Sequence, residues 1–283
     1  MIDKQMLKCL AVCASAVLAL AAAGCADEAS PSTAPVTAGE TGGDFHSLVA
    51  DPSVPGRLYV GGHTRVARSD DGGRSWTAVP ALDSADAMGW AINQGAIWVS
   101  GHPGLTVSHD GGATFEGRSD ALPDTDVHAF GAGDKAIYAA GPGIGVASST
   151  DDGVSWKTLS TEAGHAFFGR ILVDPNDSDH LIAADVQAGA MMSTDGGSTW
   201  TALGSEPAAW VSSGDSFTTL YASGGSTPQR SHDGGATWES VIVPAGATLL
   251  EAGSDGVVYA GVHDGNAVTV WISTDDGQTW TRP

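Results

Sequence analysis

Ser193-Thr-Asp-Gly-Gly-Ser-Thr-Trp200 is the stretch that decides the fold, because it recurs with small changes at five other places in the chain. The other octapeptides begin at Ser69, Ser108, Ser149, Ser231 and Ser273, and consecutive copies are 39, 41, 44, 38 and 42 residues apart. A repeat of about 40 residues is typical of one four-stranded propeller blade. We therefore predict an all-β fold over residues 44–283, a six-bladed β-propeller with one octapeptide in each four-stranded blade.

Each octapeptide has the composition of a tight turn between two strands. Its Asp is suited to accept backbone N–H groups, its Gly supplies a positive φ, and its aromatic ring buries a large apolar face. The Asp residues are Asp71, Asp110, Asp151, Asp195, Asp233 and Asp275. A calcium loop is the alternative, but the spacing lacks the alternating carboxylates and the final Glu of an EF-hand. The pattern favours a structural turn.

The octapeptides match S/T-x-D-x-G-x-S/T-W, which resembles the Asp-box, or BNR, repeat of sialidases, sortilin-type receptors and photosystem II assembly factors. The resemblance covers residues 44–283 and implies a propeller. The segments Asp44-Phe45-His46-Ser-Leu-Val-Ala-Asp51-Pro52 and Leu58-Tyr-Val-Gly-Gly-His63 resemble small exported bacterial proteins known as BNR-repeat glycosyl hydrolases. These resemblances imply either a docking platform or a glycoside hydrolase. The photosynthetic factors differ from this chain in having a basic patch and seven blades.

The strands of two blades can be placed from the repeat. In the first blade we expect strands at 45–50, 58–61, 66–68 and 76–79, and in the fourth at 171–173, 181–184, 190–192 and from 200 onward. The last strand, at 279–281, completes the sixth blade. We therefore expect the ring to close without a strand exchanged between blades.

The N-terminus has the features of an export signal. Lys4 and Lys8 precede an apolar run from Leu10 to Ala23, which is too short to span a bilayer comfortably. The run ends at Ala22-Ala23-Gly24-Cys25, which resembles the lipobox of bacterial lipoproteins and implies a diacylglycerol group on Cys25. An ordinary secretory signal is the alternative. We predict a signal peptide at 1–24, a lipidated Cys and flexible linker at 25–43, and an exported protein anchored on the extracytoplasmic face of a bacterial membrane.

Charge and cysteine content restrict the partners. The chain has 33 acidic residues, 12 Lys and Arg, and a net charge of −21, which disfavours contact with nucleic acid phosphates. The cysteines are Cys9, Cys13 and Cys25, so cleavage before Cys25 leaves no pair for a disulfide. We expect a monomer held at the membrane through its lipid, with an unidentified protein or glycan ligand.

Histidines are concentrated on one rim of the predicted propeller. The octapeptides connect the third and fourth strands of each blade, so the opposite rim carries the starts of the first strands and the loops after the second strands. Six of the nine histidines map there: His46, His63, His102, His128, His165 and His263. Arg65 and Arg170 approach the same rim by register, and we predict ligand binding by these eight residues.

A metal site is one interpretation of this rim. Neutral imidazole binds zinc and copper, so His46, His63, His102 and His128 are candidate ligands, with Met88 as a soft addition. The alternatives are that the histidines bond neighbouring carbonyl groups and close the channel, or that they bind substrate or take part in catalysis.

Hydrolysis of glycosides is the other chemistry to consider. Sialidases hold the substrate carboxylate with three arginines and use a Tyr nucleophile, whereas only Arg65 and Arg170 approach the rim and most tyrosines lie in predicted core strands. The sequence thus argues against sialidase activity. A two-carboxylate hydrolase stays open, and the candidates near the mouth are Asp44, Asp126, Asp185, Glu251 and Asp264, of which Asp44 and Asp126 are preferred. The main prediction is a membrane-anchored binding or assembly module, and the alternative is a surface glycoside hydrolase.

Overall fold

The computed structural model describes residues 38–214, 217–254 and 256–283. The predicted signal peptide and Cys25 lie outside the described residues. The described part is all-β, with 24 strands and a single turn of 3-10 helix, η1 (Pro80–Leu82). Within these ranges, no helix has the length and apolar character needed to cross a bilayer.

The strands follow one another in antiparallel units of four. The first two units are β2 (Phe45–Ala50), β3 (Leu58–Gly62), β4 (Val66–Ser69) and β5 (Thr77–Ala78), then β6 (Asp86–Asn93), β7 (Ala96–His102), β8 (Leu105–Ser108) and β9 (Glu116–Gly117). The next two are β10 (Ala129–Ala132), β11 (Ile137–Gly141), β12 (Gly145–Ser149) and β13 (Lys157–Ser160), then β14 (Phe167–Val173), β15 (Leu181–Asp185), β16 (Gly189–Ser193) and β17 (Thr201–Ala202). The last two are β18 (Trp210–Ser213), β19 (Leu220–Ser223), β20 (Gln229–Ser231) and β21 (Glu239–Ser240), then β22 (Ala247–Ala252), β23 (Val258–Asp264) and β24 (Ala267–Ser273), with β1 (Gly39–Glu40) at its edge.

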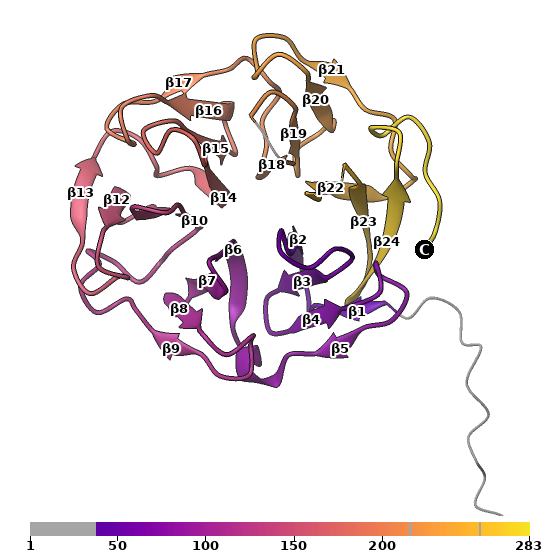
Figure 1. Cartoon of the computed structure of the whole chain (residues 1–283), viewed down its shortest axis with the longest axis horizontal. Coiled ribbons are helices and arrows are strands. Elements are labelled where there is room, and N and C mark those ends of the chain that lie inside the picture. Colours follow the sequence, from indigo (N-terminus) through magenta and orange to yellow (C-terminus); the bar gives the residue numbers. More distant parts are fainter. Residues whose placement is uncertain (1–37, 215–216, 255) are drawn as a thin grey trace, which may run out of the picture. The chain divides into compact units, whose positions relative to one another are not determined.

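These units are arranged around a common centre, with the first strand of each unit innermost (Figure 1). The inner strands β10 and β14 also pair in parallel, Ala129 with Gly169 and Phe130 with Arg170, which joins two units into one sheet of eight strands. These two inner strands can approach this closely at Gly131, because glycine has no side chain. A Cβ on Gly131 would lie 2.0 Å from the carbonyl oxygen of Ile171.

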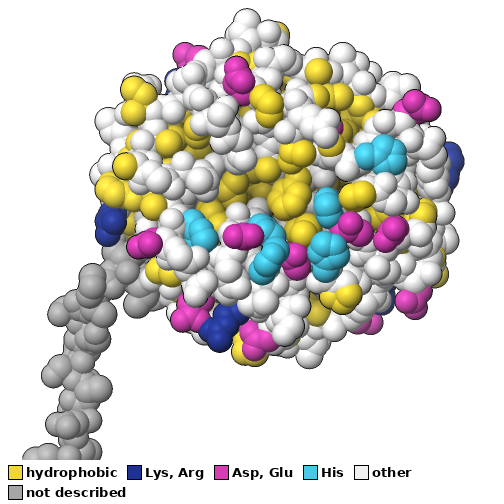
Figure 2. All heavy atoms as spheres, turned by 180° about the vertical axis from the view of Figure 1, so that it is seen from behind, with side chains coloured by type: hydrophobic (Ala, Val, Ile, Leu, Met, Phe, Trp, Pro, Cys, Tyr) yellow, Lys and Arg dark blue, Asp and Glu magenta, His cyan; other side chains and the backbone are white. Residues whose placement is uncertain are grey.

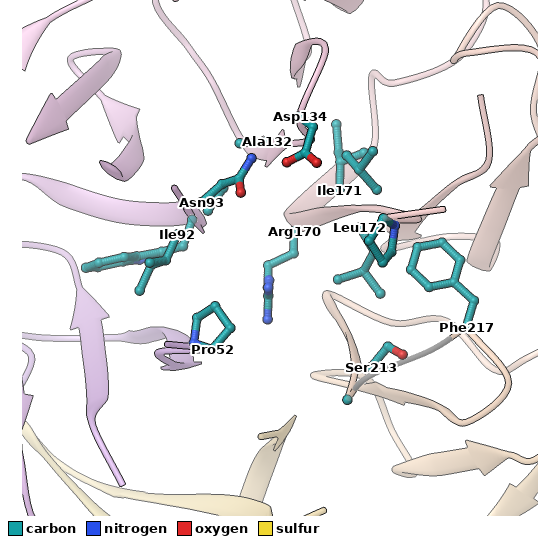
Figure 3. Close-up of a pocket in the computed structure, with 16 residues that line it drawn as sticks. Pro52, Ile92, Asn93, Ala132, Asp134, Arg170, Ile171, Leu172, Ser213 and Phe217 are labelled. Carbon is teal, nitrogen blue, oxygen red and sulfur yellow. The ribbon is translucent and has the colours of Figure 1, made fainter. Parts of the chain in front are cut away.

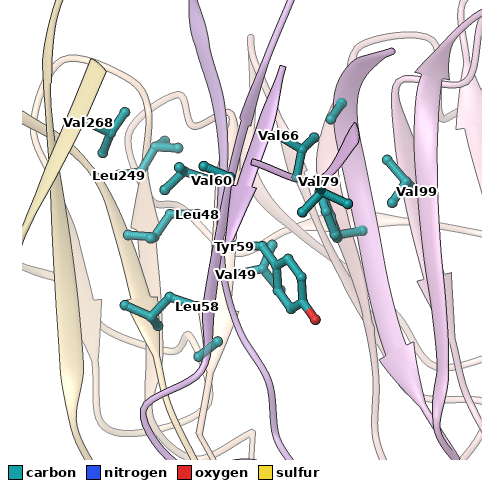
Figure 4. Close-up of a cluster of buried hydrophobic side chains, with 14 of the residues drawn as sticks. Leu48, Val49, Leu58, Tyr59, Val60, Val66, Val79, Val99, Leu249 and Val268 are labelled. Atoms are coloured by element: carbon teal, nitrogen blue, oxygen red, sulfur yellow. The ribbon is translucent and has the colours of Figure 1, made fainter. Parts of the chain in front are cut away.

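The core lies between successive units. All five residues of β3 are buried, because neighbouring units cover both faces of its sheet. Figure 4 shows Leu48 and Leu58 on one face of this sheet and Val49 and Tyr59 on the other. Burying a side chain of this size fully contributes about 1.5–3 kcal/mol.

The octapeptide turns have the hydrogen bonds expected of them. In the fourth copy, the Asp195 carboxylate accepts from the Thr199 backbone N–H (2.8 Å), the Thr199 hydroxyl (2.7 Å) and the Ser193 hydroxyl (2.8 Å). The Gly197 N–H donates to Ser193 Oγ, and the Trp200 indole donates back to the Gly197 carbonyl. The hydroxyl bond from Thr199, followed by the backbone bond, lowers the pKa of Asp195 to about 2. The carboxylate is therefore part of the turn.

The edge of the last sheet differs from the prediction. Thr281 pairs with Ile272 at one end of β24, whereas β1 pairs with the other end, Gly39 opposite Val268 and Glu40 opposite Ala267. The expectation of closure without a strand from elsewhere was therefore wrong, and residues 39–40, expected in the linker, belong to the sheet. The physical reason is that an uncovered strand edge leaves backbone groups unpaired.

The predicted strand positions otherwise agree closely with the structure. The largest difference concerns the inner strand of the fourth unit, expected at 171–173, which begins at Phe167. This extension brings Phe168 to the rim that carries the histidines.

Candidate metal centre

Three successive inner strands bring chemically active side chains to one rim. His46 lies near the start of β2, Asp86 is the first residue of β6, and His128 directly precedes β10. His63 follows β3 and His102 ends β7. Each octapeptide lies at the far end of the third strand of its unit, so this rim is opposite to the octapeptide turns.

β-Bulges orient the side chains at these strand starts. In β2, Phe45 pairs with Gly62 and Ser47 with Gly61, which leaves His46 as the extra residue. In β6, Ala87 pairs with Gly101 and Gly89 with Ser100, which leaves Met88 as the extra residue. A bulge bends the strand and re-aims a side chain.

We call His46, His63, His102, His128, Asp86 and Asp126 the histidine–aspartate cluster. Asp86 lies at its centre: Oδ1 is 2.8 Å from His46 Nδ1 and 3.3 Å from His63 Nδ1, and Oδ2 is 3.3 Å from His102 Nδ1. Figure 2 shows histidine and acidic side chains gathered beside a hollow with a hydrophobic floor.

Asp126 forms the second point of convergence. Its Oδ1 is 2.6 Å from His102 Nε2 and 2.7 Å from His128 Nε2. Asp44 lies outside the cluster, with its carboxylate 76% exposed and Oδ2 3.8 Å from His63 Nε2.

Several of these close contacts are not hydrogen bonds. His46 Nδ1 and Asp126 Oδ1 are buried, yet neither has a hydrogen-bond partner among the described residues. In these contacts an imidazole nitrogen lies close to a carboxylate oxygen, but the N–H direction of the ring does not point at that oxygen. Leaving such atoms unsatisfied is costly, and ligand atoms that converge in this way are suited to a cation.

The environment of His46 favours its neutral imidazole. Burial lowers the pKa of His46, and the neighbouring Asp86 carboxylate opposes that shift. The Phe168 ring meets His46 at 5.7 Å and His128 at 5.8 Å between ring centroids, nearly edge to face. Neutral imidazole is the form that binds metal ions.

Other predicted ligand-binding residues lie apart from the cluster. His165 is within 2.8 Å of the Pro142 carbonyl oxygen and 3.0 Å of that of Thr161, whereas the His263 ring packs near Phe45. Arg65 pairs with Glu40 of the edge strand. These three residues do not join the site that the repeat register suggested for them.

Two of the carboxylates expected near the mouth lie at the ends of strands, away from the cluster. Asp185 accepts the N–H groups of Gln187 and Ala188 at 2.8 and 2.9 Å, and Asp264 is exposed at the end of β23. In the described part of the chain, neither Asp185 nor Asp264 forms a hydrogen bond or ion pair with a residue of the histidine–aspartate cluster.

Arg170 and Glu251 lie inside the ring and not at the histidine rim, so the predicted position of both was wrong. Glu251 is fully buried on β22, 2.6 Å from Arg170 Nη1. It also accepts from the Ala50 N–H at 3.0 Å and the Trp210 indole at 3.1 Å. Burial raises the pKa of Glu251, and Arg170 opposes the rise. The pair connects four of the units.

Arg170 faces a cavity at the other end of the ring. This cavity has a volume of about 230 Å³, and its lining includes Pro52, Asn93, Asp134 and Phe217 from the far ends of the inner strands and the turns after them. Figure 3 shows Arg170 pointing into it.

Sequence reasoning missed Asp86 as the centre of the site. A signal was present, because Asp44-Phe45-His46, Asp86-Ala-Met88 and Asp126-Val-His128 occupy equivalent positions in three successive repeats. Each places an Asp two residues before a metal-binding type of side chain, at the start of an inner strand.

Comparison with known proteins adds partial similarities. No family model matches the chain. It is 32% identical over 134 residues to a xyloglucanase of Hypocrea jecorina (strain QM6a), across 44% of this chain and 16% of that protein. It is 28% identical over 180 residues to a xyloglucanase of a Paenibacillus species, across 47% of this chain and 18% of that protein. The matches thus span less than a fifth of each curated relative.

Solved structures with a similar fold are propeller proteins. A GH74 enzyme of Niastella koreensis has a TM-score of 0.60 at 16% identity, covering 88% of this chain and 46% of that one. PorZ, a surface component of the type-IX secretion system of Porphyromonas gingivalis, has a TM-score of 0.56 at 15% identity, covering 85% and 32%. YCF48 bound to D1 peptide has a TM-score of 0.50 at 13% identity, covering 85% and 96%. These likenesses show an all-β propeller fold.

Proposed function

We propose that this protein is an exported, six-bladed Asp-box propeller that binds a transition-metal ion, zinc or copper, at the histidine–aspartate cluster. The observation that supports the proposal best is the convergence of four imidazoles and two carboxylates from neighbouring units on one rim. Mixed nitrogen and oxygen ligands of this kind suit both ions.

The packing of the cluster supports metal binding over simple hydrogen bonding. Asp126 Oδ1 is 2.6 and 2.7 Å from two imidazole nitrogens, yet it is buried without a hydrogen-bond partner among the described residues. A bound cation would satisfy this oxygen and both nitrogens. The net charge of −21 also favours a cation near this surface.

The cellular setting is part of the same proposal. In it, the six four-strand units are the six blades, and the sheet of eight strands is two adjoining blades. A lipid on Cys25 holds the ring on the extracytoplasmic face of a bacterial membrane as a monomer. The ring then acts as a binding or assembly module for an unidentified protein or glycan.

Calorimetric titration of the full chain with Zn²⁺ and Cu²⁺ tests the metal site. We expect saturable binding, weakened at least tenfold by His102→Ala and by His128→Ala. His165→Ala is the matched control, because His165 contacts only backbone carbonyl groups in the structure. Absence of binding, or equal affinity in all four proteins, would exclude the metal site.

A glycoside hydrolase is the second candidate, and the partial similarity to xyloglucanases favours it. The structure offers a carboxylate pair for it, because His102 separates Asp86 Oδ2 from Asp126 Oδ1. The lengths of these two contacts, added to the width of the His102 ring, place Asp86 Oδ2 and Asp126 Oδ1 at most about 8 Å apart. This distance is compatible with the carboxylate separation in inverting glycosidases.

Release of reducing ends from xyloglucan tests this candidate. If the chain is a glycosidase, hydrolysis persists after treatment with EDTA and disappears in Asp126→Asn. A lack of product from xyloglucan and from other β-glucans would exclude it. Metal binding without hydrolysis would leave the first proposal standing alone.

A further inference from the structure

Asp86 and Asp126 contact different nitrogens of the histidines. Asp86 contacts Nδ1 three times, on His46, His63 and His102. Asp126 contacts Nε2 twice, on His102 and His128. His102 lies between the two carboxylates, with one ring nitrogen facing each of them.

The contacts of Asp86 determine which nitrogen of His102 carries the proton. The pairs Asp86–His63 and Asp86–His102 have hydrogen-bond geometry through Nδ1. A carboxylate accepts only, so Nδ1 is the donor and carries the hydrogen in the neutral ring. Nε2 of His102 is then left with its lone pair and lies 2.6 Å from Asp126 Oδ1.

The contact between His102 Nε2 and Asp126 Oδ1 therefore has no positive charge between its two atoms. An oxygen of a carboxylate and a nitrogen lone pair repel each other at 2.6 Å unless a cation or a proton lies between them. This oxygen has no hydrogen-bond partner among the described residues. His128 Nε2 meets the same oxygen from another direction.

On these grounds, and resting on the proposed metal-binding function, we propose where the ion binds and what orients its ligands. The ion lies among His102 Nε2, His128 Nε2 and Asp126. Asp86 is a positioning residue that holds the Nδ1–H of His102, and it does not bind the ion itself. Ligating histidines commonly donate their second ring N–H to a carboxylate in this way.

The distances fit this assignment after a small movement. Tetrahedral zinc bonds of about 2.0–2.1 Å place neighbouring ligand atoms about 3.3 Å apart, so the ligands must separate by roughly 0.6 Å. Three protein ligands leave the fourth position of a tetrahedral ion open to water or to an external ligand.

The neighbouring group of Asp44, His46 and His63 is the competing location. Its only approach between Nε2 and a carboxylate is His63 to Asp44, at 3.8 Å, with both side chains more than half exposed. Asp126 is less exposed, at 32%, and its contacts are about 1 Å shorter. Burial strengthens electrostatic attraction, so the ion is favoured at Asp126.

Titration of the full chain with Zn²⁺ and Co²⁺ separates these locations, with the visible absorption of Co²⁺ reporting its coordination. We expect Asp126→Asn to lower the affinity at least tenfold and to change the Co²⁺ spectrum. Asp44→Asn keeps the wild-type affinity and spectrum. An equal loss in Asp44→Asn, or a loss there alone, would overturn the assigned location.

The positioning role has a readout of its own. Asp86→Asn lowers affinity by about 10–100-fold while one ion still binds. In the Zn²⁺-loaded protein, nitrogen NMR shows His102 with its hydrogen on Nδ1 and with Nε2 on the ion, and Asp86→Asn shifts the Nδ1–H signal because its hydrogen bond to the carboxylate is lost. An unchanged Nδ1–H signal together with unchanged affinity would overturn the role of Asp86.

Circular dichroism and thermal unfolding of each variant verify that it folds, and Asp86→Glu serves as a second variant if Asp86→Asn does not. The Glu variant keeps the carboxylate and should retain the Nδ1–H tautomer. If wild-type protein binds neither ion, the proposed function itself fails. If it binds but is insensitive to Asp126→Asn, only the location proposed here fails.

Discussion

Replacing Glu251 with Ala tests how the ring is held together at its centre. The Glu251 carboxylate accepts from the Arg170 guanidinium, the Ala50 N–H and the Trp210 indole, and it is fully buried. The Ala variant leaves these three donors, on three other inner strands, without their acceptor.

The expected loss of stability follows from this geometry. Removing one partner of a buried ion pair costs about 3–5 kcal/mol, because the other charge is left uncompensated. Arg170 retains 19% exposure and lines the cavity at one end of the ring, so water can partly solvate its guanidinium. We therefore expect the lower end, about 3 kcal/mol. At about 2–4 °C per kcal/mol for a domain of this size, the melting temperature should fall by roughly 6–12 °C.

Urea and thermal unfolding, followed by circular dichroism, measure this loss. A double-mutant cycle with Arg170→Ala isolates the pair: the double variant should be more stable than the sum of the single effects predicts, by more than about 0.5 kcal/mol. Glu251→Gln is the matched variant that keeps the size and one acceptor oxygen. A loss below about 1 kcal/mol in Glu251→Ala, or strict additivity, would refute the reasoning.

Three further predictions concern the turns and the packing of the ring. Because the pKa of Asp195 is lowered to about 2, the ionised carboxylate stabilises the fold above pH 4, and this stabilisation is lost as the pH falls toward 2. The Asp195→Asn variant should therefore show a smaller fall in melting temperature between pH 5 and pH 2. A Cβ on Gly89 would lie 2.4 Å from Ser100 Oγ, so Gly89→Ala should cost about 1–3 kcal/mol in urea unfolding, whereas Gly117→Ala, with open space around it, should be nearly neutral. Gly39→Val should lower the melting temperature by several degrees more than Glu40→Ala, because a Cβ on residue 39 would lie 2.5 Å from a methyl group of Val60; equal effects would argue against β1 as the closing strand.

Much of the fold was predictable because its signals are local. Each octapeptide forms its turn through bonds spanning four residues, as between Ser193 and Gly197 or Asp195 and Thr199. The strands around it follow from short apolar runs. The repeat then assigns each residue to one end of its repeat unit, which is why six histidines were expected on one rim.

The site was only partly predictable because side-chain direction depends on details within each strand. His165 and His263 occupy the rim by register, yet His165 turns to backbone carbonyl groups and His263 packs near Phe45. Asp86 was not singled out, since the repeat pattern does not show that three Nδ1 atoms face one carboxylate.

The sequence by itself determined the repeat, the octapeptide turns and the end of the blades that carries the histidines, because these depend on contacts within about 40 residues. Tertiary structure alone decided that Glu251 meets Arg170 across 81 residues, that Gly39 reaches the strand of Val268, and that Asp86 joins His46, His63 and His102. The first two contacts join strands far apart in the sequence, and no local pattern encodes that approach. The histidines around Asp86 are near it in the sequence, but only the folded strands decide that three Nδ1 atoms lie beside its one carboxylate.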